Sequence, residues 1–279
     1  MPAAFLGHGT PMNAIEHNRY TEAWRDFGAS VPRPRAILMI SAHWYINASA
    51  VTAMAQPRTI HDFYGFPDEL FAVEYPAPGD PDLAGEIVEL VKPAWVGLDH
   101  DSWGLDHGAW SVLVHAFPAA DIPVVQLAVN AQKQFDYHLD LGAKLAALRD
   151  RGVLVLASGN IVHNLARIDW RRPDTGYRWA RAFDDAAREL MTTSPADLAG
   201  LQSHPDFAVA VPTPDHFIPL LYLAGLAASD RSTTDVLVDG YAMGALSMTA
   251  YTLGCRRFVG GAADAEPVAA QVPPDQSNI

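Results

Sequence analysis

Short, almost wholly apolar runs that end close to a histidine constrain the fold of this chain more than any other feature. The three clearest runs are Ala3–Leu6, Ala36–Ile40 and Val153–Ala157. The first two are followed within one to three residues by His8 and His43, and the third is followed by Ser158-Gly159-Asn160 and then His163. Runs of this length without polar alternation are typical of strands covered on both faces. The sequence therefore predicts an α/β fold.

The segments between these runs predict the rest of the fold. We expect helices at about residues 18–27, 82–91, 137–149, 176–202 and 217–227, and further strands near 50–55, 94–98, 122–129, 235–238 and 246–253. A chain of 279 residues with no Pro-rich or Gly-rich linker is most simply interpreted as one domain. We place that domain at residues 1–259 and predict a disordered tail at 260–279, which is rich in Ala, Pro and Gln.

Charge and cysteine content exclude several classes of partner and site. With 19 basic and 32 acidic residues, the formal net charge of −13 would repel nucleic-acid phosphates and anionic membrane surfaces. The single cysteine, Cys255, rules out an intrachain disulfide and Cys-rich metal sites. We find no signal-peptide pattern and no apolar run of membrane-spanning length, so we expect a cytoplasmic protein.

Histidines gather at the positions where ligands bind in α/β proteins. Loops at the carboxyl ends of the strands form the ligand crevice of such sheets, and His8, His43 and His163 are expected there. His107, in Asp106-His107-Gly108, and His216, after Pro212-Thr213-Pro214-Asp215, add two more. A single histidine at a strand end would more simply bond a loop carbonyl, so the prediction depends on their convergence. Imidazole suits Zn, Fe, Cu or Ni, and we predict a metal site without choosing the metal.

The remaining histidines and aromatic residues receive simpler interpretations. We expect solvated side chains for His17, His100, His115, His138 and His204. His61 lies in a long aromatic loop, residues 56–80, that could form a lid. Trp103 and Trp110 are residues of a kind that packs more often than it contacts a ligand, and Cys255 is expected to be an unreactive thiol. Dinucleotide-binding, P-loop and serine-hydrolase motifs do not occur in the sequence.

Five motifs, taken together and in order, resemble the DOPA-dioxygenase-type branch of the class III (LigB-type) extradiol ring-cleavage dioxygenases. They are Phe5-Leu6-Gly7-His8-Gly9-Thr10-Pro11-Met12, Ser41-Ala42-His43-Trp44, Trp103-Gly104-Leu105-Asp106-His107-Gly108, Ser158-Gly159-Asn160-Ile161-Val162-His163-Asn164 and Pro212-Thr213-Pro214-Asp215-His216. The resemblance extends from about residue 2 to about residue 254. It implies an α/β fold with a central mixed sheet flanked by helices and an active site at the strand carboxyl ends. It also implies a mononuclear non-haem metal, Fe(II) for activity, with Zn(II) also found in such sites.

The resemblance implies a role for each motif residue. His8 and His43 match metal ligands, and the third ligand is expected to be His216, with Asp215 as the carboxylate alternative. His163 resembles the acid/base histidine, which could also approach the metal. His107 looks like a second active-site histidine, and the substrate contacts that we expect are Asp106, Trp103 and His61.

The implied reaction inserts both atoms of O₂ into a substituted catechol similar to DOPA or caffeate and yields a ring-opened muconic semialdehyde. His163 would take a phenolic proton, and a substrate carboxylate would need a cation such as Arg58 or Arg167. The partners are then a small catechol and O₂, with a homodimer as an ordinary assembly. Two alternatives remain open at this point: a zinc hydrolase using Asp106 or Asp215 to activate water, and a binding protein of the Memo type without catalysis.

Overall fold

The computed structural model describes residues 1–255 as an α/β structure built on an eight-stranded mixed sheet. The strands are β1 (Ala3–Gly7), β2 (Ala36–Ile46), β3 (Ala50–Thr52), β4 (Gly97–Asp99), β5 (Val124–Asn130), β6 (Val153–Gly159), β7 (Asp235–Val238), β8 (Tyr241–Ala242), β9 (Leu246–Ser247) and β10 (Ala250–Leu253). The order in the large sheet is β4-β3-β5-β2-β6-β1-β10-β7, and β8 pairs separately with β9. The predicted domain end at residue 259 and the predicted tail at 260–279 lie outside the described residues.

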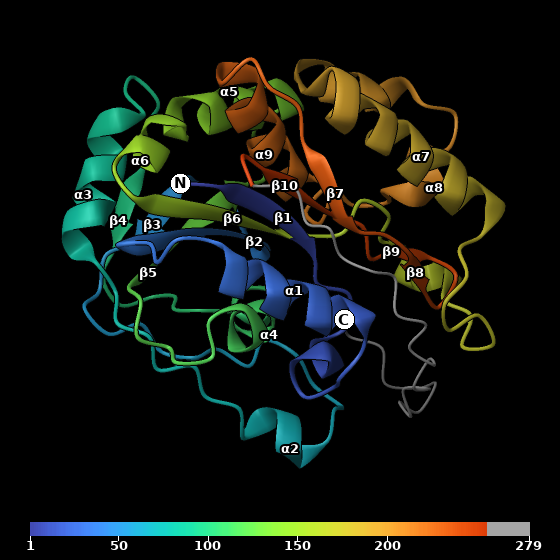
Figure 1. The fold of residues 1–279 in the computed structure, drawn as a ribbon, viewed down its shortest axis with the longest axis horizontal. Helices are drawn as coiled ribbons and strands as arrows, with labels where there is room; N and C mark the ends of the chain where they lie inside the picture. Colours follow the sequence, from blue (N-terminus) through green and yellow to red (C-terminus); the bar gives the residue numbers. More distant parts are fainter. Residues whose placement is uncertain (256–279) are drawn as a thin grey trace.

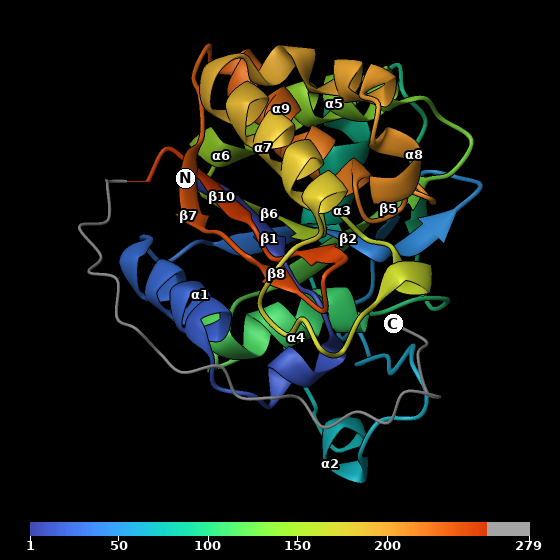
Figure 2. The ribbon, with the colours of Figure 1, turned by 90° about the vertical axis from the view of Figure 1, so that its right-hand side faces the viewer.

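Helices cover both faces of the sheet, which makes three layers (Figures 1 and 2). They are α1 (Arg19–Ser30), α2 (Asp68–Phe71), α3 (Pro81–Leu90), α4 (His107–Ala116), α5 (Phe135–Leu145), α6 (Ala147–Asp150), α7 (Arg178–Thr193), α8 (Phe207–Ala210) and α9 (Ile218–Ser229), with 3₁₀ turns at Pro11–Ala14, Leu165–Arg167 and Pro195–Ser203. In Figure 1, α5, α7 and α9 lie above the sheet, and α1 and α4 lie below it. The predicted α/β class with a central mixed sheet is confirmed.

The central strands are buried on both faces because alternate side chains enter two different cores. Phe5, Leu38 and Val155 pack with α5, α7 and α9, whereas Leu6, Met39 and Leu156 pack with α1 and α4. Successive strand side chains point to opposite faces, so a strand between two helical layers must be apolar at every position. Burial on both faces therefore explains the unbroken apolar runs of the sequence.

Helix α4 was not expected, because its sequence carries little helical periodicity. Its ten residues, HGAWSVLVHA, are buried at nine positions, so no polar stripe marks a solvent face. Asp106 begins the helix by accepting a hydrogen bond from the amide of Ala109 at 3.1 Å. The expected 176–202 helix is also divided, into α7 and the 3₁₀ segment Pro195–Ser203.

Two histidines predicted to be solvated are buried instead. His115 on α4 lies 2.7 Å by its Nε2 from the carbonyl oxygen of Asn13, and His138 on α5 lies 3.1 Å by its Nδ1 from the Tyr222 hydroxyl on α9. The polar contact of each ring comes from a distant element, so the neighbouring sequence carried no sign of burial. His17 and His100 are exposed as predicted, and His204 is half-buried.

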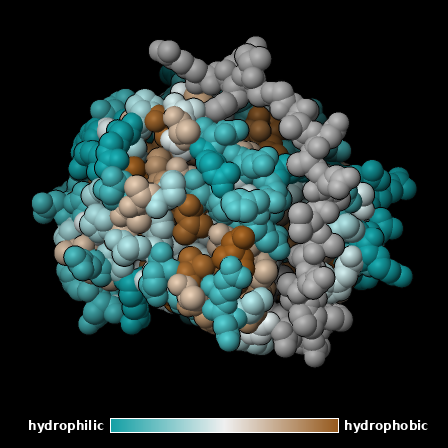
Figure 3. All heavy atoms as spheres, turned by 60° about the horizontal axis from the view of Figure 1, so that its bottom comes forward, coloured by the Kyte–Doolittle hydropathy of each residue, from teal (hydrophilic) through white to brown (hydrophobic). Residues whose placement is uncertain are grey.

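The surface is predominantly hydrophilic on the face shown in Figure 3, with apolar patches separated by polar residues. Within residues 1–255, no helix has both the length and the apolar character needed to cross a membrane.

Candidate metal centre and active site

The parallel strands at the centre of the sheet bring three of the predicted histidines to one edge. Strands β5, β2, β6 and β1 run parallel, so their carboxyl ends lie together. His8 follows β1 directly, and three residues separate His163 from the end of β6. His43 lies within β2 rather than at its end, because pairing with β6 stops at Ser41 while pairing with β5 resumes at Tyr45 after a register shift. That irregularity lies where His43 sits.

Close contacts at this edge leave no room for a side chain at two glycine positions. His8 donates its amide to the carbonyl of Gly159 at 3.2 Å, and the Asn160 amide donates to the carbonyl of His216 at 3.0 Å. A Cβ at Gly159 would lie 2.2 Å from the His216 carbonyl oxygen, and one at Gly108 would lie 2.4 Å from Ser41 Oγ. Both glycines therefore allow close approaches that place the histidine-bearing segments.

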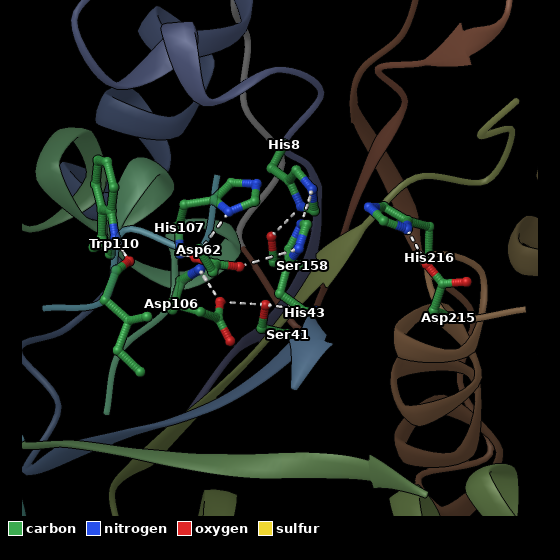
Figure 4. Close-up of polar contacts among 12 residues, drawn as sticks. His8, Ser41, His43, Asp62, Asp106, His107, Trp110, Ser158, Asp215 and His216 are labelled. Carbon is green, nitrogen blue, oxygen red and sulfur yellow. Dashed lines mark hydrogen bonds and ion pairs between the residues drawn. The ribbon is translucent and has the colours of Figure 1, made fainter. Parts of the chain in front are cut away.

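Three imidazoles, those of His8, His43 and His216, face one another with their Nδ1 atoms turned toward outer partners (Figure 4). The Nδ1 of His8 lies 2.8 Å from Ser158 Oγ, and the Nδ1 of His43 lies 3.3 Å from Asp62 Oδ2. The Nδ1 of His216 bonds the carboxylate of the neighbouring Asp215. A carboxylate partner holds the proton on Nδ1, so Nε2 carries no proton and its lone pair is directed inward.

The spacing of these rings fits three ligands of one metal ion. Their ring centres are 5.1, 5.3 and 5.0 Å apart, and the Nε2 atoms of His8 and His43 are 3.2 Å apart. With metal–nitrogen distances of about 2.1 Å and angles between octahedral and tetrahedral, two ligand nitrogens lie roughly 3.0–3.4 Å apart and the ring centres roughly 4.6–5.3 Å apart. Nε2 of His216 is buried and has no hydrogen-bond partner among the described residues. The donor set therefore suits a transition metal that binds imidazole.

His107 lies beside this triad and shares a carboxylate with it. Its Nδ1 and its backbone amide lie 3.0 and 2.9 Å from Asp62 Oδ1, while the other oxygen of Asp62 faces His43. Nitrogens of His8, His43 and His107 could also hold a metal by distance alone, as could atoms of His163, Asp215 and His216. However, the His43 and His107 ring centres are only 3.7 Å apart, which is closer than the spacing of two imidazoles on one ion.

His163 lies on the opposite side of His216. The two rings stack with centres 3.5 Å apart and planes 4° from parallel, and the His163 amide donates to the carbonyl of Ala210 at 3.0 Å. Nε2 of His163 is buried and finds no partner within residues 1–255. A cavity of about 560 Å³ is lined by His43, His107, His163 and His216, together with Ala42, Tyr45, Asp62, Tyr64, Asn164, Leu165, Ala166, Pro212, Thr213 and Asp215.

Burial and mutual proximity keep the core imidazoles uncharged. The pKa of His8, of His43 and of His163 falls well below the usual value, first because burial penalises the charged ring and then because neighbouring histidines would repel it. Burial alone would raise the pKa of Asp215, but the hydrogen bond and charge of His216 outweigh it and lower that pKa. The neutral rings of His8 and His43 are in the state that a metal ligand needs.

Three expected substrate contacts are not at the cavity. Asp106 is fully buried and accepts hydrogen bonds from Ser41 Oγ at 2.6 Å and from Trp103 Nε1 at 3.2 Å. His61 turns toward the carbonyl of Val73 at 2.9 Å, in a cluster of aromatic rings. None of Asp106, Trp103 and His61 lines the cavity. Asp106 instead begins α4 and so places His107, because the helix starts where its carboxylate caps the chain.

The two arginines considered for a substrate carboxylate also lie outside the cavity lining. Arg58 donates to the carbonyl of Ser102 at 2.8 Å, and Arg167 is exposed. Cys255 is half-buried and burial raises the pKa of its thiol, in agreement with the expected low reactivity.

The sequence interpretation missed Asp62, which contacts two histidines of the site. It selected the adjacent His61 from the same loop. A usable signal was an acidic residue between aromatic residues in a loop expected to be ordered, because histidine ligands usually have carboxylate partners.

Comparisons with known proteins show the family of the chain. The family described as "Catalytic LigB subunit of aromatic ring-opening dioxygenase" matches residues 2–254. The chain is 45% identical to the 4,5-DOPA dioxygenase extradiol of Escherichia coli (strain K12), over 91% of this chain and 95% of that relative. It is 36% identical to the protein of the same name from Beta vulgaris, over 88% of this chain and 94% of that relative.

A solved structure is similar in fold as well. The crystal structure of the uncharacterized protein JW3007 from Escherichia coli K12 superposes with a TM-score of 0.80 at 42% identity, and covers 91% of this chain and 100% of that chain.

Proposed function

The chain belongs to the family of catalytic LigB subunits of aromatic ring-opening dioxygenases, and we propose that it opens the ring of a DOPA-like catechol by extradiol cleavage. Sequence identity of 45% to a relative named 4,5-DOPA dioxygenase extradiol is the observation that carries the substrate class. Both atoms of O₂ would enter the product, a ring-opened muconic semialdehyde.

We propose that His8, His43 and His216 hold Fe(II). The support is the set of three Nε2 atoms directed inward and three outer partners, Ser158, Asp62 and Asp215, that hold the Nδ1 atoms. An iron ion in this position would supply the binding of O₂ and of both catechol oxygens. Zinc fits the same nitrogen donors, so metal identity is part of the proposal that experiment must decide.

The chain's own residues supply proton transfer and orientation. His163 lines the cavity and has a buried Nε2 without a hydrogen-bond partner in the described part of the chain, and we assign it the acceptance of a catechol hydroxyl proton. His107 also lines the cavity and is oriented by Asp62, so it can donate a hydrogen bond to, or accept one from, the hydroxyl oxygens of the catechol. Burial of the histidines excludes water from their inner nitrogens.

The cavity wall suggests how the substrate side chain is held. A volume of about 560 Å³ lies within the range of small-molecule sites. Tyr45, Tyr64, Asn164 and Thr213 are the neutral polar residues of its lining, and within the described chain that lining includes neither Lys nor Arg. We therefore infer that the side chain of the catechol is held by neutral hydrogen-bonding groups.

The two alternative functions are not favoured. A zinc hydrolase would need Asp106 or Asp215 to activate water, but Asp106 lies behind Ser41 and outside the cavity lining, and Asp215 is bonded to His216. A non-catalytic binding protein does not fit relatives named as dioxygenases at 45% and 36% identity.

The direct test measures O₂ uptake by anaerobically iron-loaded protein with L-DOPA, caffeate and protocatechuate, while visible absorbance reports a yellow product. Stoichiometric O₂ uptake with L-DOPA supports the proposal. Iron-containing protein that consumes no O₂ with any of the three catechols contradicts it.

The residue assignments need a separate variant set. His163→Ala should keep its iron and lose turnover by about 100-fold or more, as expected for a general acid–base group. His8→Ala and His43→Ala should lose the iron itself. Loss of iron in His163→Ala would contradict this division of roles.

A further inference from the structure

Asp184 is a fully buried carboxylate, distant in sequence from the site, that gathers three hydroxyl donors. It lies on α7 and accepts hydrogen bonds from Ser247 Oγ at 2.6 Å, Thr249 Oγ1 at 2.9 Å and Tyr241 Oη at 3.1 Å. All three donors belong to one segment, residues 241–249, which contains β8 and β9. Burial of a carboxylate is costly unless its oxygens are bonded, so this number of donors fixes the segment against α7.

Only one cation lies near this carboxylate among the described contacts. Arg188 is 3.9 Å from Asp184 and 3.0 Å from the half-buried Asp239. Burial raises the pKa of Asp184 to about 6, although the hydroxyl hydrogen bonds oppose that rise. Figures 1 and 2 show α7 beside β8 and β9 at one end of the molecule.

The same segment holds the backbone that carries His163. Ser247 donates its amide to the carbonyl of Val162 at 3.0 Å, and Asn164 donates its amide to the carbonyl of Ala245 at 3.2 Å. Leu246 forms an isolated antiparallel bridge with His163. Nδ2 of Asn160 adds a bond to the Ser247 carbonyl at 2.7 Å. These contacts bracket His163 on both sides along the chain.

We propose that Asp184 is a positioning residue for His163, acting through its three hydroxyl bonds to residues 241–249 and the backbone bonds from that segment to residues 160–164. The inference rests on the proposed function, because the catalytic consequence depends on His163 being the proton acceptor. The carboxylate itself touches neither the cavity nor a proposed metal ligand. A small displacement of a catalytic group costs up to about 100-fold in rate even when the substrate still binds.

The first test measures amide hydrogen exchange in the metal-free protein and does not depend on activity. In Asp184→Ala, exchange at Asn164 and Ser247 should accelerate about tenfold or more, while the Val91 amide in the α3 cap should keep its wild-type rate. Asp184→Asn should restore most of the protection, because its amide oxygen still accepts hydroxyl bonds. Asp239→Asn is the matched control, since it pairs with the same Arg188 but bonds none of the three hydroxyls, and it should leave all these rates unchanged.

The second test separates kcat from KM in iron-loaded protein. Asp184→Ala should lower kcat for L-DOPA about tenfold, with KM and iron content within about twofold of wild type, and Asp184→Asn should recover most of kcat. If Asp184→Ala does not fold, Ser247→Ala removes one of the three bonds and should show a smaller change in the same direction. Unchanged exchange at Asn164, or equal acceleration at Asn164 and Val91, overturns the proposal. If iron-loaded wild-type protein does not cleave the catechol ring, the proposed function is refuted. The exchange measurement then still decides whether Asp184 positions the backbone around His163.

Discussion

Removal of the negative charge of Asp62 should weaken metal binding without unfolding the protein. One oxygen of Asp62 faces Nδ1 of His43 at 3.3 Å, and the other faces Nδ1 and the amide of His107 at 3.0 and 2.9 Å. In Asp62→Asn a single oxygen remains. It should stay with the backbone amide of His107, which donates to Asp62, and this turns the side-chain NH₂ toward the N–H of His43. His43 then either loses its partner or shifts its proton to Nε2, the atom that we assign to the metal.

The expected magnitude follows from the charged contact that His43 loses. A hydrogen bond to a charged group contributes about 1.5–3 kcal/mol, which corresponds to a Kd roughly 10- to 150-fold weaker. The measured range for outer partners of histidine ligands, about 10- to 100-fold, agrees with this figure. Ser158→Ala removes a neutral partner of His8 worth about 0.5–1.5 kcal/mol, so its Kd should weaken by only about 2- to 10-fold.

The assay is competition for Zn²⁺ between the apo-protein and a coloured chelator at pH 7, with unfolding by urea measured in parallel. Asp215→Asn should weaken binding as much as Asp62→Asn, because it removes the charged partner of His216. Asp121→Asn is the control, since that carboxylate pairs with Arg33 on the surface. Wild-type zinc affinity in folded Asp62→Asn, or a larger loss in Ser158→Ala than in both aspartate variants, would refute the reasoning.

Two further perturbations test the backbone and the buried histidines. Gly159→Ala places a Cβ 2.2 Å from the His216 carbonyl oxygen, so it should lower the free energy of unfolding by about 1–3 kcal/mol and weaken zinc binding. Gly85→Ala is the control, because a Cβ there meets open space and should change neither quantity. Wild-type stability in urea and wild-type zinc affinity for Gly159→Ala would contradict this. Burial lowers the pKa of His138 to about 4, so between pH 6.5 and 4 the unfolded chain binds more protons at this residue than the folded chain does. His138 should therefore reduce the free energy of unfolding by about 3 kcal/mol as the pH drops through that window. Urea denaturation at several pH values should show a shallower fall in His138→Gln, and an identical slope would show that His138 is not the cause.

Local sequence patterns were enough to specify the α/β class, the central strands and the histidines near their ends. Apolar runs such as Ala36–Ile40 are local, and their burial on both faces follows from the alternation of side chains along a strand. The end of a strand is equally local, so the sequence alone places His8 and His163 at the sheet edge. Helix α4 escaped detection because burial on nearly every side removes the periodic pattern that marks a helix.

Which groups meet at the site depends on tertiary contacts that no local pattern carries. The carboxylate that orients His43 comes from Asp62 in a loop, and the hydroxyl that faces His8 Nδ1 comes from Ser158 on β6. Asp106 and His61 carry suitable side chains, yet contacts with other segments turn them away from the cavity: Asp106 bonds Ser41 on β2, and His61 bonds the carbonyl of Val73. Residue type and spacing fix what a side chain can do. Its direction depends on contacts between segments far apart in the chain, such as Asp184 with residues 241–249, and those contacts exist only after the chain has packed.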